Sequence, residues 1–381
     1  MKLRYFDHAA TTRINEDVLK EMLPYLSNEY GNPSSAYSLG RSAKRAIEAS
    51  HQKVARLIGA KPNEIYFTSC GSECNNTALC GIAYANKEKG NHIITSKIEH
   101  PSVLETCKAL ENEGFTVTYL NVDKNGFINI NELLYSITPQ TILISIMFAN
   151  NEIGTIQPIN EISQIAKSHN IVFHTDAVQA VGNVKIDVKS MGIDLLSLSG
   201  HKIYAPKGVG AIYIRDGVNI AKFLNGGHQE KNKRAGTENV ASIVGIGKAC
   251  EICLNNFDNI YSKNLFLRNY FIEQITKSIP DFKINGSLEK RLPGNCNVSF
   301  KNINASNLLL KLDGYGICAS AGSACSTGQA SPSHVLTAIG LPPELAFASL
   351  RVTFGAENTK DDVDFLVSAL ARSVNELRNS N

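Results

Sequence analysis

The sequence predicts an α/β fold with a mostly parallel central sheet in a large domain and a smaller α+β domain. Over roughly the first 250 residues, short apolar runs alternate with segments of helical period. After about residue 255, short strands mix with longer helices, which is typical of an α+β unit. The chain has 381 residues, too many for one ordinary core. We therefore expect a large domain over 15–255, and a small domain formed by 1–14 together with 256–381.

The large domain is predicted from seven apolar runs separated mostly by helical patterns. A helix at 160–170 carries Ile162, Ile165 and Ala166 on one face. Strand–helix–strand spacing of this kind predicts a mostly parallel sheet covered on both faces. The expected strands are 64–68, 92–96, 116–120, 142–148, 171–175, 194–199 and 210–214.

The small domain is predicted to begin with a long helix over 260–279 that ends before Pro280. Ser331 and Pro332 are expected to be the N-cap and first residue of a later helix, which Gly340 ends. The other expected strands lie at 282–284, 297–300 and 349–354, and the expected helices at 305–313, 332–340 and 359–378.

Composition excludes several classes of protein. Charged residues make up 19% of the chain and the formal net charge is only +3, without the basic clusters of nucleic-acid-binding proteins. The longest apolar run, 142–149, is too short to span a bilayer. The basic N-terminus lacks the apolar segment of a secretory signal, and nine cysteines follow no disulfide-type spacing. We expect a cytoplasmic protein with free thiols, no membrane contact and no direct nucleic-acid binding.

Lys202 follows an apolar strand in "SLSGHKIYAPKGVG", residues 197–210. Ligands of parallel sheets bind outside the carboxyl ends of the strands, so Lys202 is expected at a ligand-binding edge. A solvated surface lysine is the alternative that this segment alone favours.

Asp176 follows another buried strand in "FHTDAVQA", residues 173–180. A carboxylate there is costly unless a cation meets it. The alternative is an ordinary helix N-cap.

Small residues connect a strand to a helical pattern in "FTSCGSECNN", residues 67–76. A helix that starts at Gly71 and Ser72 would direct free N–H groups and the positive end of its dipole at a phosphate. Helix capping alone would also explain these residue types.

Cys325 lies among alanine, serine, glycine and threonine, with no apolar neighbour to pack against. A reactive thiol must ionise, and a segment of small residues would let it travel between partners. The alternative is a tolerated exposed cysteine.

Three of these features together match the needs of pyridoxal phosphate: a lysine to bind it covalently, a carboxylate for its ring nitrogen, and a helix start for its phosphate. Asp176 and Lys202 are 202 − 176 = 26 residues apart, which allows one crossover and one strand between them. Both are therefore expected at the same sheet edge.

The chain resembles the NifS/IscS-type cysteine desulfurases, a branch of the class V aminotransferase family and of the fold-type I pyridoxal phosphate enzymes. The combination of "SGHK" and "GSAC" at this separation is specific to that branch. The segments that carry the resemblance are "YFDHAATT", "GNPSSAYSLGR", "FTSCGSECNN", "EHPSVLET", "ANNEIGTIQP", "HTDAVQA", "SGHKIYAPKGVGA", "KRAGTENV", "SAGSACSTG" with "SPSHVL", and "SLRVTFG".

The resemblance assigns a role to each candidate residue. Lys202 would bind the cofactor covalently, Asp176 would pair with its ring nitrogen, and His100 would stack on the ring and act as acid and base. Asn151 and Gln179 would contact the phenolic oxygen of the ring, and Asn32 and Arg351 would bind the substrate carboxylate. The implied phosphate ligands are Gly71, Ser72, Ser199 and His201, with Thr237 from the second subunit of a homodimer.

Cys325 would be the nucleophile in this family. Its thiolate would take sulfur from L-cysteine as a persulfide, release L-alanine, and pass the sulfur to a protein of iron–sulfur cluster assembly or tRNA thiolation. The distance from Cys325 to Pro332 is similar to that in family members with a long cysteine loop.

Two other functions remain open at this point. Another pyridoxal phosphate enzyme, such as an aminotransferase or a selenocysteine lyase, would keep Lys202 and Asp176, although an aminotransferase has no use for Cys325. A sulfur carrier or scaffold would need no cofactor. Cys250 and Cys253 lie within a helical pattern without a second pair, so no metal site is expected. Cys74 and the histidines at 92, 169 and 174 are expected to pack or to form local hydrogen bonds.

Overall fold

The computed structural model describes residues 2–321 and 332–379, and its upper part is built on a seven-stranded sheet. The strand order is β2-β8-β7-β6-β5-β3-β4, and within the described residues only β8 runs opposite to the others. The strands are β2 (Ile65–Thr68), β3 (His92–Ser96), β4 (Thr116–Leu120), β5 (Thr141–Ser145), β6 (Val172–Asp176), β7 (Leu195–Ser199) and β8 (Gly210–Ile214). The predicted mostly parallel sheet is confirmed. β8 is antiparallel because no helical crossover separates it from β7.

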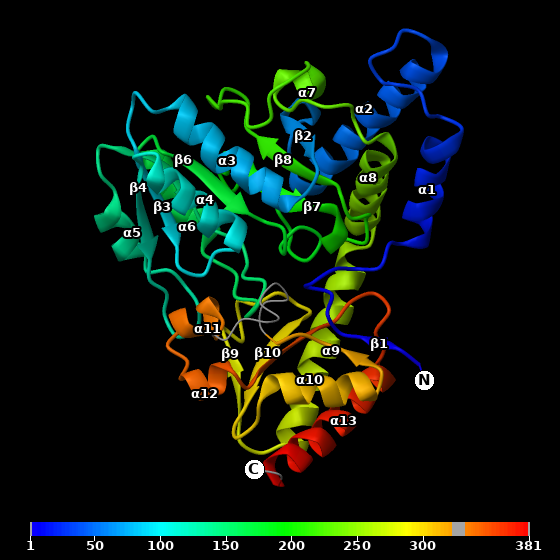
Figure 1. Cartoon of the computed structure of the whole chain (residues 1–381), viewed down its shortest axis with the longest axis vertical. Coiled ribbons are helices and arrows are strands. Elements are labelled where there is room, and N and C mark those ends of the chain that lie inside the picture. Colours follow the sequence, from blue (N-terminus) through cyan, green and yellow to red (C-terminus); the bar gives the residue numbers. More distant parts are fainter. Residues whose placement is uncertain (1, 322–331, 380–381) are drawn as a thin grey trace.

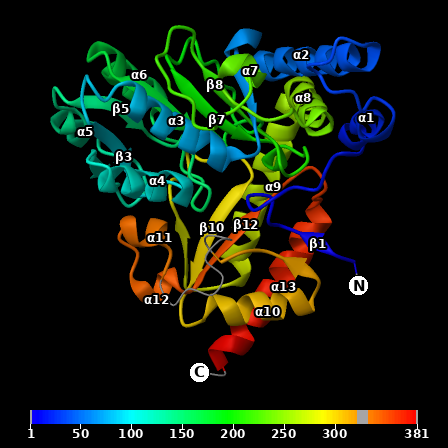
Figure 2. The ribbon, with the colours of Figure 1, turned by 45° about the horizontal axis from the view of Figure 1, so that its top comes forward.

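Helices cover both faces of this sheet (Figures 1 and 2). Neighbouring strand residues alternate between two apolar clusters: Ile93 packs with α3 and α4, whereas Ile94 packs with α2 and α8. The helices of this part are α1 (Glu16–Ser27), α2 (Ser38–Ile58), α3 (Gly71–Ala85), α4 (Pro101–Asn112), α5 (Ile130–Ser136), α6 (Ile159–Ser168), α7 (Gln229–Asn232) and α8 (Val240–Asn255), with 3-10 turns η1 (Pro62–Glu64) and η2 (Gly200–Lys202).

The lower part of Figure 1 contains an antiparallel sheet of order β12-β10-β9 and a parallel pair, β1 with β11. Phe6 packs into the apolar cluster formed by α9, α10, α13 and these strands. This contact supports the proposed small domain of 1–14 with 256–381. Its elements are β1 (Arg4–Tyr5), α9 (Phe257–Ser278), β9 (Phe282–Asn285), β10 (Asn295–Phe300), α10 (Ala305–Gly314), β11 (Ile317–Cys318), α11 (His334–Ala338), α12 (Pro343–Ala346), β12 (Ser349–Thr353) and α13 (Lys360–Asn379).

Several element boundaries differ from the sequence prediction by one to three residues. The α9 helix begins at Phe257 rather than at residue 260, and β5 ends at Ser145 rather than at residue 148. The helix expected from Pro332 begins at His334 instead, because the Ser333 hydroxyl accepts the Val335 and Leu336 amides and is the N-cap. Ser331 lies outside the described residues. No helix among the described residues is long and apolar enough to cross a membrane.

Candidate active site

Asp176 and Lys202 lie at the same edge of the sheet, as their spacing predicts. Asp176 is the last residue of β6, and it is in register with Ser197 of the parallel strand β7. Lys202 ends the η2 turn that follows β7 directly. The carboxyl ends of adjacent parallel strands therefore hold both side chains, which is where open α/β sheets bind ligands.

One cavity of about 270 Å³ brings most of the predicted site residues together. This volume is close to the lower end of small-molecule sites. Ten of the predicted residues line it: Gly71, Ser72, His100, Asn151, Asp176, Gln179, Ser199, His201, Lys202 and Arg351.

Of the three other predicted residues, the two that the structure describes do not line this cavity. Asn32 is exposed in the turn before α2, where its side chain accepts the Ser34 amide. Thr237 lines a separate hollow, together with Ser69. Cys325 lies outside the described residues.

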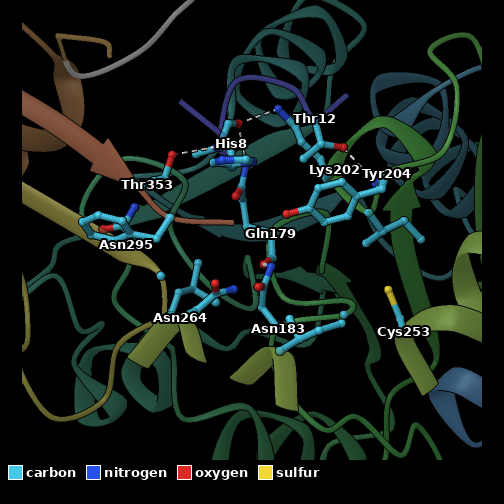
Figure 3. A pocket seen from close by; sticks show the side chains of 17 residues that line it. His8, Thr12, Gln179, Asn183, Lys202, Tyr204, Cys253, Asn264, Asn295 and Thr353 are labelled. Atoms are coloured by element: carbon cyan, nitrogen blue, oxygen red, sulfur yellow. Dashed lines mark hydrogen bonds between the residues drawn. The ribbon is translucent and has the colours of Figure 1, made fainter. Parts of the chain in front are cut away.

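The amine of Lys202 is held at the cavity wall by the N-terminal segment of the chain. Its Nζ donates to the carbonyl oxygens of Ala9, at 2.6 Å, and Ala10, at 2.7 Å. Figure 3 shows Lys202 from a second, smaller cavity of about 50 Å³, which His8, Gln179 and Tyr204 also line. Lys202 thus lines both cavities, and its amine is hydrogen-bonded to the N-terminal segment.

The start of α3 fits a phosphate group. Gly71 is the first helical residue, and a Cβ atom there would come within 2.7 Å of Val178 Cγ2, so the backbone can border the cavity only without a side chain. Ser199 Oγ is buried at the same cavity without a hydrogen-bond partner among the described residues. Free N–H groups, the helix dipole and an unpaired hydroxyl are the donors that a phosphate needs.

His201 lines the same cavity, and its ring is neutral at neutral pH. Burial, and next the charge of Lys202, lowers the pKa of His201 to about 4. Its Nδ1 lies 3.2 Å from Thr11 Oγ1. At neutral pH this imidazole can therefore offer one N–H to an anion without adding a full charge.

A chain of hydrogen bonds joins Asp176 to His100. Asn75 Nδ2 donates to Asp176 Oδ2 at 2.7 Å and to Ser102 Oγ at 2.9 Å. Ser102 Oγ lies 2.8 Å from His100 Nδ1, and the Ser102 amide donates to the same nitrogen at 3.1 Å. Because Nδ1 accepts from a backbone N–H, it carries no proton, and the proton of the neutral ring is on Nε2.

This arrangement favours a neutral His100. Burial lowers its pKa, and the Lys202 charge acts in the same direction, while Asp176 opposes them. A proton on Nδ1 would also face the Ser102 amide, which can only donate. An activity that needs the neutral ring is then retained at high pH and lost as the pH falls through the pKa of His100.

We expect Ser102→Ala to raise the pKa of His100, because one donor to the unprotonated Nδ1 is lost. The acid limb of the rate profile should move to higher pH, with little change at alkaline pH. Thr106→Ala is a matched control, since its hydroxyl donates only to the Ser102 carbonyl on the same helix. The pH dependence of turnover in both variants checks this, and an unmoved acid limb in Ser102→Ala would remove Ser102 from the network.

The remaining cysteines and histidines discussed above are packed in apolar clusters or hydrogen-bonded locally in the described part of the chain. Cys74 is buried beside Thr68 and packs in the apolar cluster under α3, and burial raises the pKa of its thiol. Cys250 and Cys253 are buried in the core on α8. His92 lies between Thr118 and Thr141, and His174 between Ser145 and Ser197. No group of three metal-binding side chains occurs in the described part of the chain.

Sequence reasoning missed three residues that support the site: Asn75, Ser102 and Asp7. Asn75 and Ser102 form the network around His100. Asp7 Oδ1 accepts from Arg351 Nη2 at 2.8 Å. The motifs that contain them, "SECNN", "EHPS" and "YFDHAA", are visible in the sequence. The partners of Asn75 and Asp7 are not, because Asp176 and Arg351 belong to other elements that are distant in the sequence.

Comparison with known proteins agrees with this geometry. Residues 4–366 match the family described as Aminotransferase class-V. "Cysteine desulfurase IscS" of Clostridium botulinum (strain Hall) is 52% identical over 376 residues, which cover 98% of this chain and 95% of that protein. A solved "NIFS-LIKE PROTEIN" is 37% identical, with a TM-score of 0.93 over 98% of this chain and 100% of the other.

A second solved structure, "SspA in complex with cysteine", is 38% identical with a TM-score of 0.82, covering 93% of this chain and 100% of the other. The family match spans most of the chain, and the similarity to the Clostridium botulinum protein covers nearly all of both sequences. The chain therefore belongs to the aminotransferase class-V family and, within it, to the cysteine desulfurases.

Proposed function

We propose that the protein uses pyridoxal phosphate to remove sulfur from L-cysteine, releasing L-alanine and leaving a persulfide on Cys325. One observation carries the proposal: Lys202, Asp176, His100 and Arg351 line a single cavity at the end of the parallel strands. An amine, a carboxylate, an imidazole and a guanidinium are the groups that this reaction needs. The names of the relatives support the same substrate.

The cofactor would be held by residues of four elements. Gly71 and Ser72 at the start of α3, with Ser199 and His201, would bind its phosphate. Asp176 would hold a proton on the ring nitrogen, and Asn75 keeps this carboxylate in place by its hydrogen bond. When bound, pyridoxal phosphate supplies an electron-accepting ring for chemistry at the substrate carbon.

The chain's own groups would perform the remaining work. Arg351 would bind the substrate carboxylate, the Lys202 amine would move the substrate α-proton, and His100 would donate a hydrogen bond from Nε2. The Cys325 thiolate would form an S–S bond with the substrate sulfur as the carbon–sulfur bond breaks. That carbon then takes a proton, so the remaining product is L-alanine.

The assay that tests the proposal supplies the purified holoenzyme with L-cysteine and dithiothreitol and no keto-acid acceptor. We expect L-alanine and sulfide in equal amounts. An aminotransferase would need the acceptor and would keep its turnover in Cys325→Ser. A sulfur carrier would bind no pyridoxal phosphate and stay colourless, so either behaviour would contradict the proposal.

We expect Asp176→Ala to lower turnover by about 100-fold or more, because an unprotonated ring is a poor electron sink. Asp258→Ala is the matched control, since its carboxylate is 84% exposed in an ion pair with Lys185. Turnover at saturating L-cysteine, measured with the bound cofactor quantified, checks this. Near-normal turnover in Asp176→Ala would exclude Asp176 from the site.

The same proposal includes a cytoplasmic homodimer in which Thr237 of each subunit completes the phosphate site of the other. Thr237 does not line the main cavity of its own chain, which supports a role at the phosphate site of the other subunit. The sulfur acceptor would be an iron–sulfur scaffold, as the IscS name of the relatives suggests, or a tRNA-thiolation enzyme. Copurification of the protein from its own cells would identify that acceptor.

A further inference from the structure

Arg351 is a buried cation whose donors are only partly used by the described residues. Its side chain is 1% exposed and lines the main cavity. Nη1 donates to the Asn151 carbonyl oxygen at 3.0 Å, and Nη2 donates to Asp7 Oδ1 at 2.8 Å. Nε is buried without a partner among the described residues. A buried guanidinium with an open donor beside a cavity is suited to an anion, because unpaired buried donors are costly.

Asp7 is fixed against this guanidinium by two further elements. Its second oxygen, Oδ2, accepts from Ser320 Oγ at 2.6 Å. The Arg351 amide in turn donates to the Ser320 carbonyl at 2.7 Å, and Asp7 pairs with Thr353 as an isolated β-bridge. The carboxylate is only 14% exposed. The Asp7 carboxylate is therefore held in a fixed ion pair with Arg351 and is not a mobile surface charge.

The carboxylate of Asp7 affects how tightly a second carboxylate can bind Arg351. An anion that binds Arg351 meets a cation that is already paired, and it also meets the negative charge of Asp7. Like charges repel each other at such short distances. The Asp7 carboxylate therefore weakens the binding of a ligand carboxylate to Arg351. Affinity that is equal for the substrate and the transition state does not speed the chemical step, so weaker binding of both need not reduce turnover.

We propose that Asp7 is a positioning residue that holds Arg351 in place and at the same time competes with the substrate carboxylate, keeping the affinity for amino-acid carboxylates low. This inference rests on the proposed function, in which Arg351 binds that carboxylate. Because the product L-alanine carries the same carboxylate as the substrate, Asp7 would also weaken the binding of L-alanine and so favour its release.

The test uses the holoenzyme and the variant Asp7→Asn, which keeps an acceptor oxygen for Arg351 but removes the charge. Binding of L-alanine is measured by its effect on the visible spectrum of the cofactor. We expect the dissociation constant for L-alanine and the KM for L-cysteine to fall by about three- to tenfold, as removal of a nearby like charge would cause. Binding of cysteamine, which lacks the carboxylate, should change less than twofold.

Three further variants make the result decisive. Ser320→Ala removes the hydroxyl bond but leaves the Asp7 charge, so it should change L-alanine binding less than Asp7→Asn does. Asp7→Ser is a second neutral replacement, for use if Asp7→Asn fails to fold, with the same expected direction. Arg351→Lys should weaken L-alanine binding, because the bidentate geometry is lost.

The outcomes separate this inference from the proposed function. Unchanged or weaker L-alanine binding in the neutral Asp7 variants, with Arg351→Lys also weakened, overturns the competition by Asp7 and leaves the function standing. Unchanged L-alanine binding in Arg351→Lys removes Arg351 from the carboxylate site, and the inference falls with it. An equal change for cysteamine and L-alanine would show that Asp7 acts only through general structure.

Discussion

Replacing Cys325 with alanine is expected to abolish the formation of sulfide and L-alanine from L-cysteine, with a loss of at least about 1000-fold in turnover. The protein should stay yellow and should still bind L-cysteine, because the cofactor cavity is formed by other residues. The physical reason is that the proposed reaction needs a thiolate to receive the sulfur, and Cys325 is the residue to which we assign that role. Sulfide release and the visible spectrum, measured on the same sample, check both parts.

Cys318→Ala is the matched control for this experiment. Cys318 lies in β11, earlier in the same part of the chain, and burial raises the pKa of its thiol. A thiol that ionises less readily is a poor nucleophile, so this variant should keep its turnover. Sulfide production at the parent rate in Cys325→Ala would show that the nucleophile has been assigned to the wrong cysteine.

Replacing Lys202 with alanine is expected to remove the yellow colour of the protein as well as its activity. The amine is the only proposed covalent link to pyridoxal phosphate, and it is also the group that would move the substrate proton. The loss of a positioned acid–base group alone lowers turnover by about 100- to 10,000-fold. The absorption spectrum after addition of the cofactor and removal of its excess measures the first effect, and L-alanine formation measures the second.

Lys207→Ala is the control, because Lys207 is exposed on the same loop and does not line the cavity. This variant should keep both its colour and its turnover. If Lys202→Ala retained a stable yellow cofactor after gel filtration, covalent attachment at Lys202 would be excluded. A colourless parent protein that still released sulfide would exclude the cofactor itself.

The sequence predicts the sheet well because periodicity is a local property. Ile93 and Ile94 face different apolar clusters, as strand alternation requires, and all seven predicted strands of the large sheet are present. The start of α11 is less predictable, since Ser331 and Ser333 are equally good N-caps by residue type and only the structure shows which amides are capped.

Some residues of the candidate site can be predicted from the sequence, and others cannot. Lys202 and Asp176 follow strands directly, so the topology alone places them at one edge. Asn75 and Asp7 could not be predicted, because their partners are 101 and 344 positions away in the sequence. The tautomer of His100 is also beyond sequence reasoning, since it depends on the Ser102 amide and hydroxyl that meet Nδ1.

Direct detection of the transferred sulfur tests the central claim. The holoenzyme is mixed with L-cysteine as the sole added thiol, and the reaction is stopped after one turnover. The peptides are analysed by mass spectrometry, and free L-alanine is measured in the same sample. We predict one extra sulfur atom on the peptide that contains Cys325 and one L-alanine per active site. L-Alanine formed without sulfur on Cys325, or sulfur found on another cysteine, would contradict the account.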